Sequence, residues 1–240
     1  MNGGKNCYPG SEVLINKYNI HDKQLLEKLE IQKVTVKLLA LDINPDRIEY
    51  TYDVDHLVNI HKYLFGDIYE WAGTFREENL YKSERVLSGG SAEYADYHDV
   101  AGKLQKLFDI YKTFDWEKAS DIGSSVSDFL LELWSIHPFR EGNTRTCITF
   151  LWHYLYGKGI NFQVELLQNN PMYVRDSLVM ANYEQKEYLV RIISDALSNV
   201  AKQKEYMQHN NNLKEKYHIA KDDYETFREK YSIKKNETEG

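Results

Sequence analysis

Apolar residues recur at spacings of three and four along most of this chain, and that spacing predicts amphipathic helices. The pattern is clearest over residues 119–136, where the apolar positions are Ile122, Val126, Phe129, Leu130, Leu133 and Trp134. A second stretch, residues 147–156, is apolar almost throughout. The two stretches predict a pair of core helices with a short loop, residues 137–146, between them.

The same spacing predicts that most of the remaining chain is helical. The predicted helices are residues 21–41 (as one or two helices), 53–65, 94–114 and 185–201, with another that restarts at Pro171. Helical periodicity fails over residues 74–92, which are polar and contain Gly89-Gly90. We therefore expect an all-α domain over residues 21–200. An irregular lead-in over 1–20 precedes it, and a polar, helical extension over 201–240 follows it.

The loop at 137–146 reads His-Pro-Phe-Arg-Glu-Gly-Asn-Thr-Arg-Thr and concentrates groups suited to phosphate chemistry. Gly142 permits backbone angles that other residues avoid. A helix that begins at about Asn143 or Thr144 points its first N–H groups at the loop, where they form an anion site. Arg145 is a forked, permanently charged group that can bind phosphate oxygens in bidentate fashion.

Two further residues of this loop complete the predicted chemistry. Glu141 is a hard oxygen ligand, suited to Mg²⁺ that meets a protein through one or two carboxylates and the phosphates of a substrate. Of the side chains in this loop, the imidazole of His137 is the one that can accept a proton near neutral pH without a large pKa shift. Taken singly, each is more often a structural or surface residue. Their ordered combination predicts transfer from a nucleotide to a hydroxyl.

The run at 137–145 resembles the signature of the Fic (filamentation induced by cAMP) family, usually His-Pro-Phe-x-(Asp/Glu)-Gly-Asn-Gly-Arg-x-x-Arg. A second block at 61–73, His-Lys-Tyr-Leu-Phe-Gly-Asp-Ile-Tyr-Glu-Trp-Ala-Gly, resembles the family's upstream helix and its entry into a flap. The blocks lie in the family's order, so coincidence is improbable. The resemblance implies a Fic-type helical bundle with a small β-hairpin flap next to the active site.

The resemblance also implies a protein adenylyltransferase, which moves AMP from ATP to a Ser, Thr or Tyr hydroxyl of a protein target. With Mg²⁺ as cofactor, His137 would take the hydroxyl proton and Glu141 would hold the metal. Gly142 and Asn143 would cradle the phosphates, and Arg145 would hold the distal ones. The Tyr-rich extension makes the chain itself a candidate target.

Three residues outside the loop are predicted to join the site on the strength of the resemblance. Asn79 and Lys82 align with flap residues, Asn79 to position the target and Lys82 to contact the nucleotide. The flap would bind the target by main-chain pairing. Tyr173 would stack on the adenine base. The structural alternatives are a solvated turn for Lys82 and a core tyrosine for Tyr173.

Two departures from the family pattern leave alternatives open. Thr144 replaces a second Gly; it counts among the predicted phosphate-binding residues, and its hydroxyl can cap the following helix. Ile148 replaces a second Arg that grips the γ-phosphate in the family. One alternative is kinase-type phosphoryl transfer with an inverted nucleotide, as in a related branch that lacks this Arg. The other is a non-catalytic nucleotide- or partner-binding module.

The family's inhibitory pattern, (Ser/Thr)-x-x-x-Glu-(Gly/Asn), has one match, Thr-Phe-Arg-Glu-Glu-Asn at 74–79. It falls in the presumed flap instead of on a helix, so we interpret the match as accidental. Inhibition would then come from a separate inhibitor protein, as in toxin-antitoxin pairs, or from a homo-oligomer.

Composition excludes several other classes of function. The 240 residues carry a net charge of −7, which argues against a general nucleic-acid-binding face. Cys7 and Cys147 give neither a disulfide framework nor a metal pattern. His56 and His61 lack a carboxylate partner at a recognised metal-site spacing and are read as structural. No apolar run approaches the ~20 residues of a membrane span. We expect a cytoplasmic protein without nucleic-acid or membrane partners.

Overall fold

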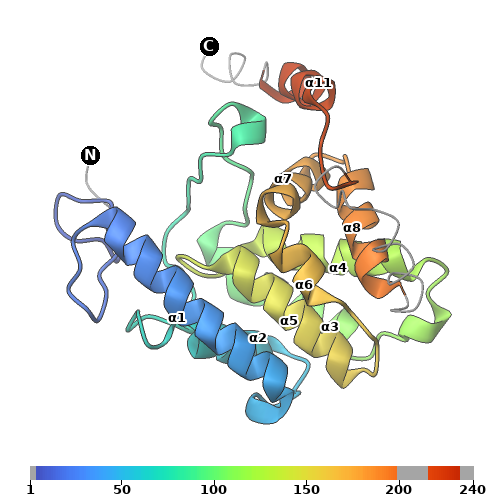
Figure 1. Ribbon diagram of the computed structural model, residues 1–240, viewed down its shortest axis with the longest axis horizontal. Helices are drawn as coiled ribbons and strands as arrows, with labels where there is room; N and C mark the ends of the chain where they lie inside the picture. Colours follow the sequence, from blue (N-terminus) through green and yellow to red (C-terminus); the bar gives the residue numbers. More distant parts are fainter. Residues whose placement is uncertain (1–3, 199–215, 233–240) are drawn as a thin grey trace. The chain divides into compact units, whose positions relative to one another are not determined.

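The computed structural model describes residues 4–198 and 216–232, and the regular structure in these ranges is helical (Figure 1). The chain divides into two compact units, each described by itself. The first comprises residues 4–79, 95–114 and 136–157. The second comprises residues 80–94 and 115–135 and the described residues from 158 onward. The expected all-helical architecture is confirmed.

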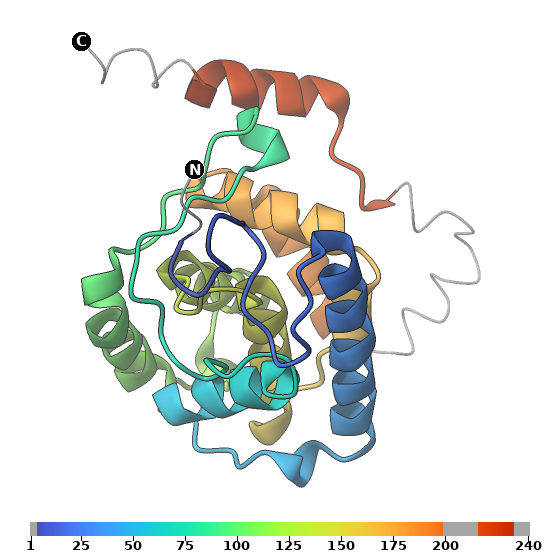
Figure 2. The same ribbon diagram turned by 90° about the vertical axis from the view of Figure 1, so that its left-hand side faces the viewer.

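The first unit is built around α2, which packs against three other helices. The helices are α1 (Lys23–Ile43), α2 (Val54–Phe65), α3 (Val100–Tyr111) and α5 (Asn143–Gly157), with 3₁₀ turns η1 (Pro45–Arg47) and η3 (Tyr97–Asp99). Residues 21–41, expected as one or two helices, form the single helix α1, and Asp22 caps it by accepting the N–H of Leu25. Figure 2 shows α1 in blue, with the irregular N-terminal segment looped near its first turns.

Two histidines form a buried polar pair in the core of the first unit. His153 Nε2 lies 2.8 Å from the carbonyl oxygen of Pro45, to which it donates, and its Nδ1 lies 2.8 Å from His56 Nε2. With its Nε2–H used in this way, His153 presents Nδ1 as the acceptor of the His56 Nε2–H, and burial lowers the pKa of His153. Burial lowers the pKa of His56 to about 3. Among the described residues no cluster of three metal-binding side chains occurs, and the His56 side chain hydrogen-bonds to His153 within the core.

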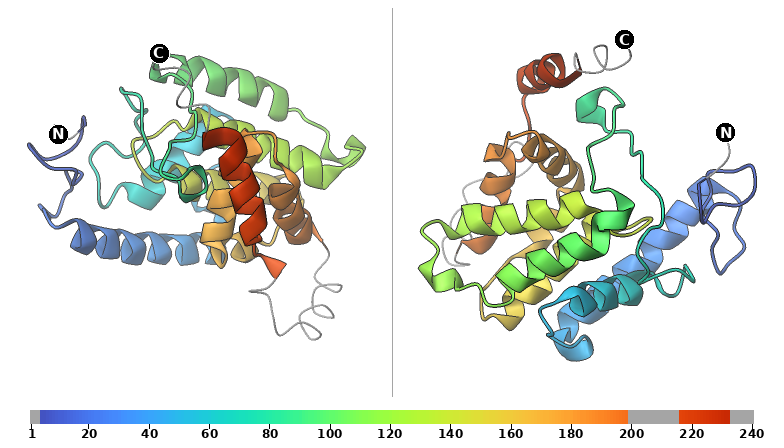
Figure 3. Two further views of the ribbon diagram at one scale, coloured as in Figure 1. Left: turned by 90° about the horizontal axis from the view of Figure 1, so that it is seen from above. Right: turned by 180° about the vertical axis from the view of Figure 1, so that it is seen from behind.

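The second unit contains the helices α4 (Ile122–Ile136, whose last residue falls in the first unit), α6 (Val164–Gln168), α7 (Pro171–Asn182), α8 (Glu187–Leu197) and α11 (Lys221–Ser232), with 3₁₀ turns η2 (Arg85–Leu87) and η4 (Trp116–Lys118). α7 packs against α6 and α8, and η2 packs against both α7 and α11. Figure 3 shows α11 in red from two further sides. Of the predicted extension, residues 201–240, the structure describes residues 216–232, which contain the helix α11. The prediction for the rest of the extension lies outside the described residues.

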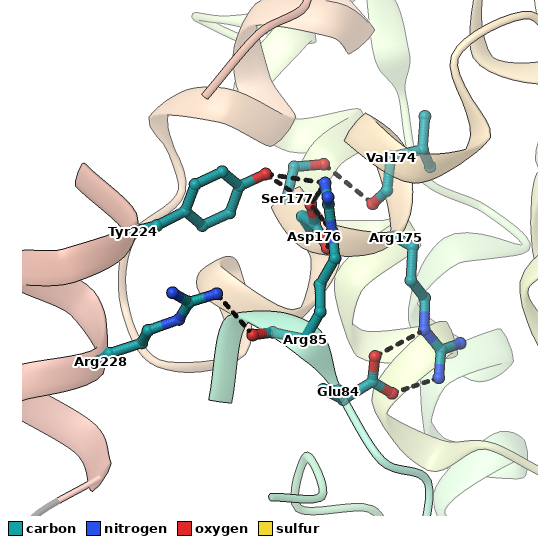
Figure 4. A network of polar contacts seen from close by, with 8 residues as sticks. All are labelled: Glu84, Arg85, Val174, Arg175, Asp176, Ser177, Tyr224 and Arg228. Atoms are coloured by element: carbon teal, nitrogen blue, oxygen red, sulfur yellow. Dashed lines mark hydrogen bonds and ion pairs between the residues drawn. The ribbon is translucent and has the colours of Figure 1, made fainter. Parts of the chain in front are cut away.

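Polar contacts attach α11 to the rest of the second unit (Figure 4). Asp176 on α7 pairs with the guanidinium of Arg85 in η2, and the Tyr224 hydroxyl donates to Asp176 Oδ2 at 2.6 Å. Arg228 Nη2 donates to the carbonyl oxygen of Arg85 at 3.0 Å. The C-terminal helix is therefore bonded both to α7 and to the 80–94 segment.

The predicted β-hairpin flap is not confirmed as a pair of strands. Within residues 4–198 and 216–232 no β-strand forms, and the 80–94 segment has one isolated antiparallel bridge, between Ser83 and Ser91. Glu84 N donates to Gly90 O at 2.8 Å, and η2 occupies the turn between them. The segment thus folds back on itself, but its backbone bonds are too few to make a ladder.

Hydropathy adds one finding: in the part of the chain that the structure describes, no helix has the length and apolar character needed to cross a bilayer.

Candidate functional site

The loop at 137–142 enters α5 in a conformation that only certain residues tolerate. His137 is 1% exposed and has φ +51°, in the left-handed region where His is among the tolerated non-glycine residues. Gly142 has φ +79°, and a Cβ at this position would overlap the ring of Phe65. Its carbonyl accepts the N–H and the hydroxyl of Thr146, both at 2.9 Å. Backbone angle and packing together therefore require glycine immediately before α5.

Asn143 braces the loop from inside. Its side-chain amide accepts the N–H of Phe139 at 2.8 Å and donates to the carbonyl oxygen of Phe139 at 2.7 Å. The family resemblance predicted that Asn143 helps to cradle the phosphates, but the structure uses its side-chain amide to close the loop. α5 begins at Asn143, as predicted, so an anion contact here falls to the main-chain N–H groups of the first turn.

Glu141 is held next to the start of α5 by two contacts. Its own Oε1 accepts the N–H of Gly142 at 2.9 Å. Its carbonyl oxygen lies 3.1 Å from His61 Nε2, while His61 Nδ1 accepts the N–H of Gly73 at 2.8 Å. His61 is therefore the neutral Nε2–H tautomer, and burial lowers its pKa to about 4. Its ring stacks on Phe139 with centroids 3.8 Å apart, so one histidine positions both the carboxylate residue and the loop anchor.

Arg76 connects the segment before the 80–94 region to the histidine of the loop. The side chain is 4% exposed, and its Nε donates to the carbonyl oxygen of His137 at 2.7 Å. Its main-chain N–H donates to Pro138 O at 2.8 Å. The same guanidinium donates to Asn79 Oδ1 at 3.2 Å, and Asn79 also accepts the N–H of Tyr97 at 3.0 Å. The 74–79 match to the inhibitory pattern is irregular instead of helical, which agrees with its interpretation as accidental.

Arg145 is engaged by a buried carboxylate from α1. Its Nη2 lies 2.5 Å from Glu30 Oε1, and Glu30 Oε2 accepts the hydroxyl of Tyr69 at 2.5 Å. The guanidinium also lies over the Phe65 ring, 4.9 Å from the centroid. The guanidinium of Arg145, which is predicted to bind phosphate, is thus held by the ion pair with Glu30 and by the cation–π contact with Phe65. Phe65 is also the side chain that packs against Gly142.

Two predicted site residues belong to the second unit. Lys82 makes its main-chain contact there, donating its N–H to Ser91 Oγ at 3.1 Å. Tyr173 is buried, and its hydroxyl donates to the carbonyl oxygen of Tyr188 at 3.0 Å. Burial raises the pKa of Tyr173 to about 12. These are the contacts of a core tyrosine, the alternative that the sequence left open.

The first unit therefore brings together most of the predicted residues: His137, Glu141, Gly142, Asn143, Thr144, Arg145 and Asn79. Sequence reasoning missed Glu30 and Arg76 and undervalued His61. A signal for Glu30 exists, because it shares the apolar face of α1 with Leu26 and Val34, each four residues away. Arg76 has no comparable signal, since it stands in a stretch rich in both charges.

A divalent metal would find one suitable carboxylate in this loop. Since no cluster of three metal-binding side chains occurs among residues 4–198 and 216–232, the protein alone does not form a cage. Glu141, half-buried and fixed through both its carbonyl and its carboxylate, fits a Mg²⁺ ion that takes its other ligands from substrate phosphates and water.

Comparison with known proteins agrees with this geometry. The Fic/DOC family model matches residues 51–155. The chain is 34% identical over 149 residues to the probable protein adenylyltransferase y4lH of Sinorhizobium fredii, covering 60% of this chain and 71% of that protein. It is 27% identical over 164 residues to the protein adenylyltransferase VbhT of Bartonella schoenbuchensis, covering 68% of this chain but 33% of VbhT.

Solved structures share the fold at lower identity. The BepC protein of Bartonella tribocorum, solved with bound AMPPNP, aligns with a TM-score of 0.67 and 19% identity over 81% of this chain and 96% of that one. The signature loop, its buried anchor Phe139 and the glycine entry to α5 thus occur in a chain that shares both sequence and fold with these proteins. The chain belongs to the Fic/DOC family.

Proposed function

We propose that this chain is a Mg²⁺-dependent protein adenylyltransferase that moves AMP from ATP to a hydroxyl of a protein target. The observation that carries the proposal is the single loop in which His137, Glu141, the start of α5 and Arg145 follow one another in fixed contacts. Relatives named as protein adenylyltransferases support the assignment. The target can include the chain's own tyrosines.

In this proposal His137 accepts the proton of the target hydroxyl as its oxygen attacks the α-phosphorus of ATP. The new bond joins that oxygen to the α-phosphorus, the bond from the α-phosphorus to the bridging oxygen breaks, and pyrophosphate leaves. Arg76 supports this step, because its bond to the carbonyl of His137 fixes the residue in its left-handed conformation without using the imidazole. Arg76 therefore holds His137 through the main chain and does not use the ring nitrogens that would accept the proton.

The leaving phosphates would meet three groups near the start of α5. Because Glu141 Oε1 accepts the N–H of Gly142, the main-chain N–H groups of Asn143 and Thr144 supply the anion site, and Arg145 supplies a guanidinium close to it. Gly142 would serve the site through its left-handed backbone, which forms the entry to α5. Mg²⁺, when bound, would neutralise charge on the departing oxygens, with Glu141 as its protein ligand. Glu30 lowers the positive charge that Arg145 presents, so the strength of phosphate binding depends on this ion pair.

Asn79, Lys82 and Tyr173 complete the proposal as predictions. Asn79 would help to hold the target, since it sits where Arg76 and Tyr97 fix its amide oxygen. Lys82 would reach the nucleotide from the folded-back 80–94 segment. Tyr173 would stack on the adenine base through its ring. Its hydroxyl already donates to the carbonyl oxygen of Tyr188, so the ring is the part that would contact the base.

The decisive experiment is incubation with Mg²⁺ and ATP labelled in turn at the α- and γ-phosphate, with label counted on the chain and on lysate proteins. We expect transfer of the α-label and none of the γ-label. His137→Asn should abolish transfer. Asn lacks a basic nitrogen but tolerates the left-handed backbone that Ala would strain. His98→Asn, the same change at an exposed histidine, should retain activity.

Two other outcomes lead to different functions. Transfer of the γ-label would make the chain a kinase, the alternative favoured by Ile148, which is buried on α5 where the family motif has an arginine. Absence of both labels with saturable ATP binding would make it a nucleotide-binding module. Either result would reject adenylyl transfer.

A further inference from the structure

Helix α1 has two apolar faces, of which one is used inside the first unit. The inner face places Leu26, Val34 and Leu41 in the core, where α1 packs against α2. The other face carries six positions separated alternately by four and three residues. These positions, which we call the outer seam, are Leu25, Leu29, Gln32, Val36, Leu39 and Ile43.

The outer seam is largely exposed although five of its six residues are apolar. Leu25 is 53% exposed, Val36 64%, Leu39 59% and Ile43 83%. An alternation of four and three averages 3.5 residues per repeat, the period at which two helices pack along one line. With Leu29, Val36 and Ile43 at the a positions and Leu25, Gln32 and Leu39 at d, the seam has the pattern of a two-stranded coiled coil. Exposed apolar residues in this order are typical of a helix that pairs with another helix.

We propose that the outer seam pairs with the same seam of a second copy of this chain, with the two α1 helices antiparallel. In this register Leu25 packs with Ile43 of the second copy, Leu29 with Leu39, and Gln32 with Val36. A two-fold axis exchanges the two copies and reproduces the same pairs, so each copy uses the same surface in the interface. Gln32 therefore occurs in two symmetry-related layers near the centre of the pairing, where a polar core position helps to fix the register, as polar core residues do in coiled coils.

Charge complementarity selects this orientation. The g positions beside the seam are Lys28, Thr35 and Asp42. In the antiparallel register Lys28 of each copy faces Asp42 of the other, giving two ion pairs of opposite charge. A parallel arrangement would instead set Lys28 against Lys33 of the second copy, at the e position. Two lysines in contact would oppose that arrangement.

One like-charge approach remains in the antiparallel register, because Lys33 of the two copies lies near the two-fold axis. The Lys33 ammonium lies 5.5 Å from the centroid of the Tyr18 ring, with which it also interacts through a hydrogen bond that raises the pKa of Lys33. Tyr18 thus provides a partner for this charge within each copy.

The outer seam lies on a helix that also contributes to the site in the first unit. The same helix carries Glu30, which holds Arg145. The proposed interface and the ion pair that holds Arg145 therefore share one helix, with the outer seam on its exposed face and Glu30 on its buried face.

The test is sedimentation of the full chain over a dilution series, in reducing buffer because Cys7 is partly exposed. We expect a monomer–dimer equilibrium. Leu39→Glu should raise the dissociation constant roughly a hundredfold, since each dimer loses two apolar contacts. Ile31→Glu is the matched control: Ile31 is 61% exposed on the same helix but outside the seam, and its change should leave the equilibrium unaltered.

The orientation is tested by exchanging charges. Lys28→Asp alone and Asp42→Lys alone should each weaken the dimer several-fold, and the double variant Lys28→Asp/Asp42→Lys should restore it. A chain that stays monomeric at every concentration would overturn the proposal and leave the seam to a different protein. Equal effects of Leu39→Glu and Ile31→Glu would overturn it too, and failure of the double variant to recover would reject the antiparallel register.

Discussion

Single residues in the first unit carry more than one constraint. Gly142 combines a positive φ with contact to the Phe65 ring, and Phe65 in turn supports the guanidinium of Arg145. His61 fixes the carbonyl of Glu141 and the bend at Gly73 with its two nitrogens. Because each of these residues contacts several groups, we expect small substitutions here to change stability or ligand binding more than the few atoms altered would suggest.

Gly142→Ala should lower the free energy of unfolding by about 2–4 kcal/mol, because the added methyl meets both an unfavourable backbone angle and the Phe65 ring. Gly159→Ala separates the two causes. Gly159 has φ +76°, but a Cβ there would meet nothing within 4 Å, so this variant should lose only about 1 kcal/mol. Urea unfolding measures both, and equal losses would mean that contact with Phe65 is unimportant.

Glu30→Gln should strengthen ATP binding several-fold while lowering stability by about 1 kcal/mol. The variant removes a negative charge 2.5 Å from Arg145 but keeps a side chain that can accept the Tyr69 hydroxyl. Calorimetric titration with ATP and Mg²⁺ measures the affinity. Glu12→Gln, at an exposed carboxylate, is the control and should change neither quantity. Weaker ATP binding in Glu30→Gln would show that Glu30 orients Arg145 instead of competing for it.

At the scale of elements, the second unit shows how a helix outside the family-matched region is attached. α11 contacts η2 and α7 through Tyr224 and Arg228, and the Tyr188 hydroxyl donates to Asp223 at 2.5 Å. The bond from Tyr224 ends on a carboxylate, whereas that from Tyr231 ends on the main-chain carbonyl of Tyr183 at 2.7 Å. Bonds to charged acceptors are the stronger kind.

Tyr224→Phe should therefore loosen α11 more than Tyr231→Phe does. We expect a loss of about 1.5–3 kcal/mol for the first and about 1 kcal/mol for the second. Hydrogen exchange of the α11 amides is the measurement, because both changes retain the aromatic ring and act on this helix first. Identical exchange in the two variants would contradict the ranking of the two bonds.

At the scale of the whole molecule, buried histidines make stability depend on pH. Burial lowers the pKa of His56 to about 3 and that of His61 to about 4, against about 6.5 in an unfolded chain. Below pH 6.5 the unfolded chain binds protons that the folded chain does not. The free energy of unfolding therefore falls as the pH falls from about 6.5 towards 4, and the loss is absent above that range.

Between pH 7 and pH 5 each of these two histidines should cost about 2 kcal/mol of stability. Urea unfolding at the two pH values measures the sum. NMR signals of the ring protons identify the residues, since both imidazoles should remain neutral at pH 5. If the ring of His56 or His61 titrated near pH 6.5 in the folded chain, that histidine would not contribute to the predicted fall in the free energy of unfolding.

The sequence by itself determined the helical architecture, the start of α5 at Asn143 and the position of the loop chemistry. These follow from local rules: apolar spacing sets the helices, and a glycine before Asn-Thr sets the helix entry. It also predicted a flap hairpin that the described residues do not show as strands, because resemblance to a family does not fix how many ladder bonds a segment makes.

Only the tertiary structure decided which groups support that loop. Glu30 lies 115 residues from Arg145 along the chain, and Arg76 lies 61 residues from His137. No local pattern encodes such pairs, since they form when α1 packs on α2 and when the 74–79 segment crosses the loop. The sequence thus specified which chemical groups the loop offers. Packing of distant segments decided which partners hold them, because burial leaves each charge and each carbonyl in need of a partner.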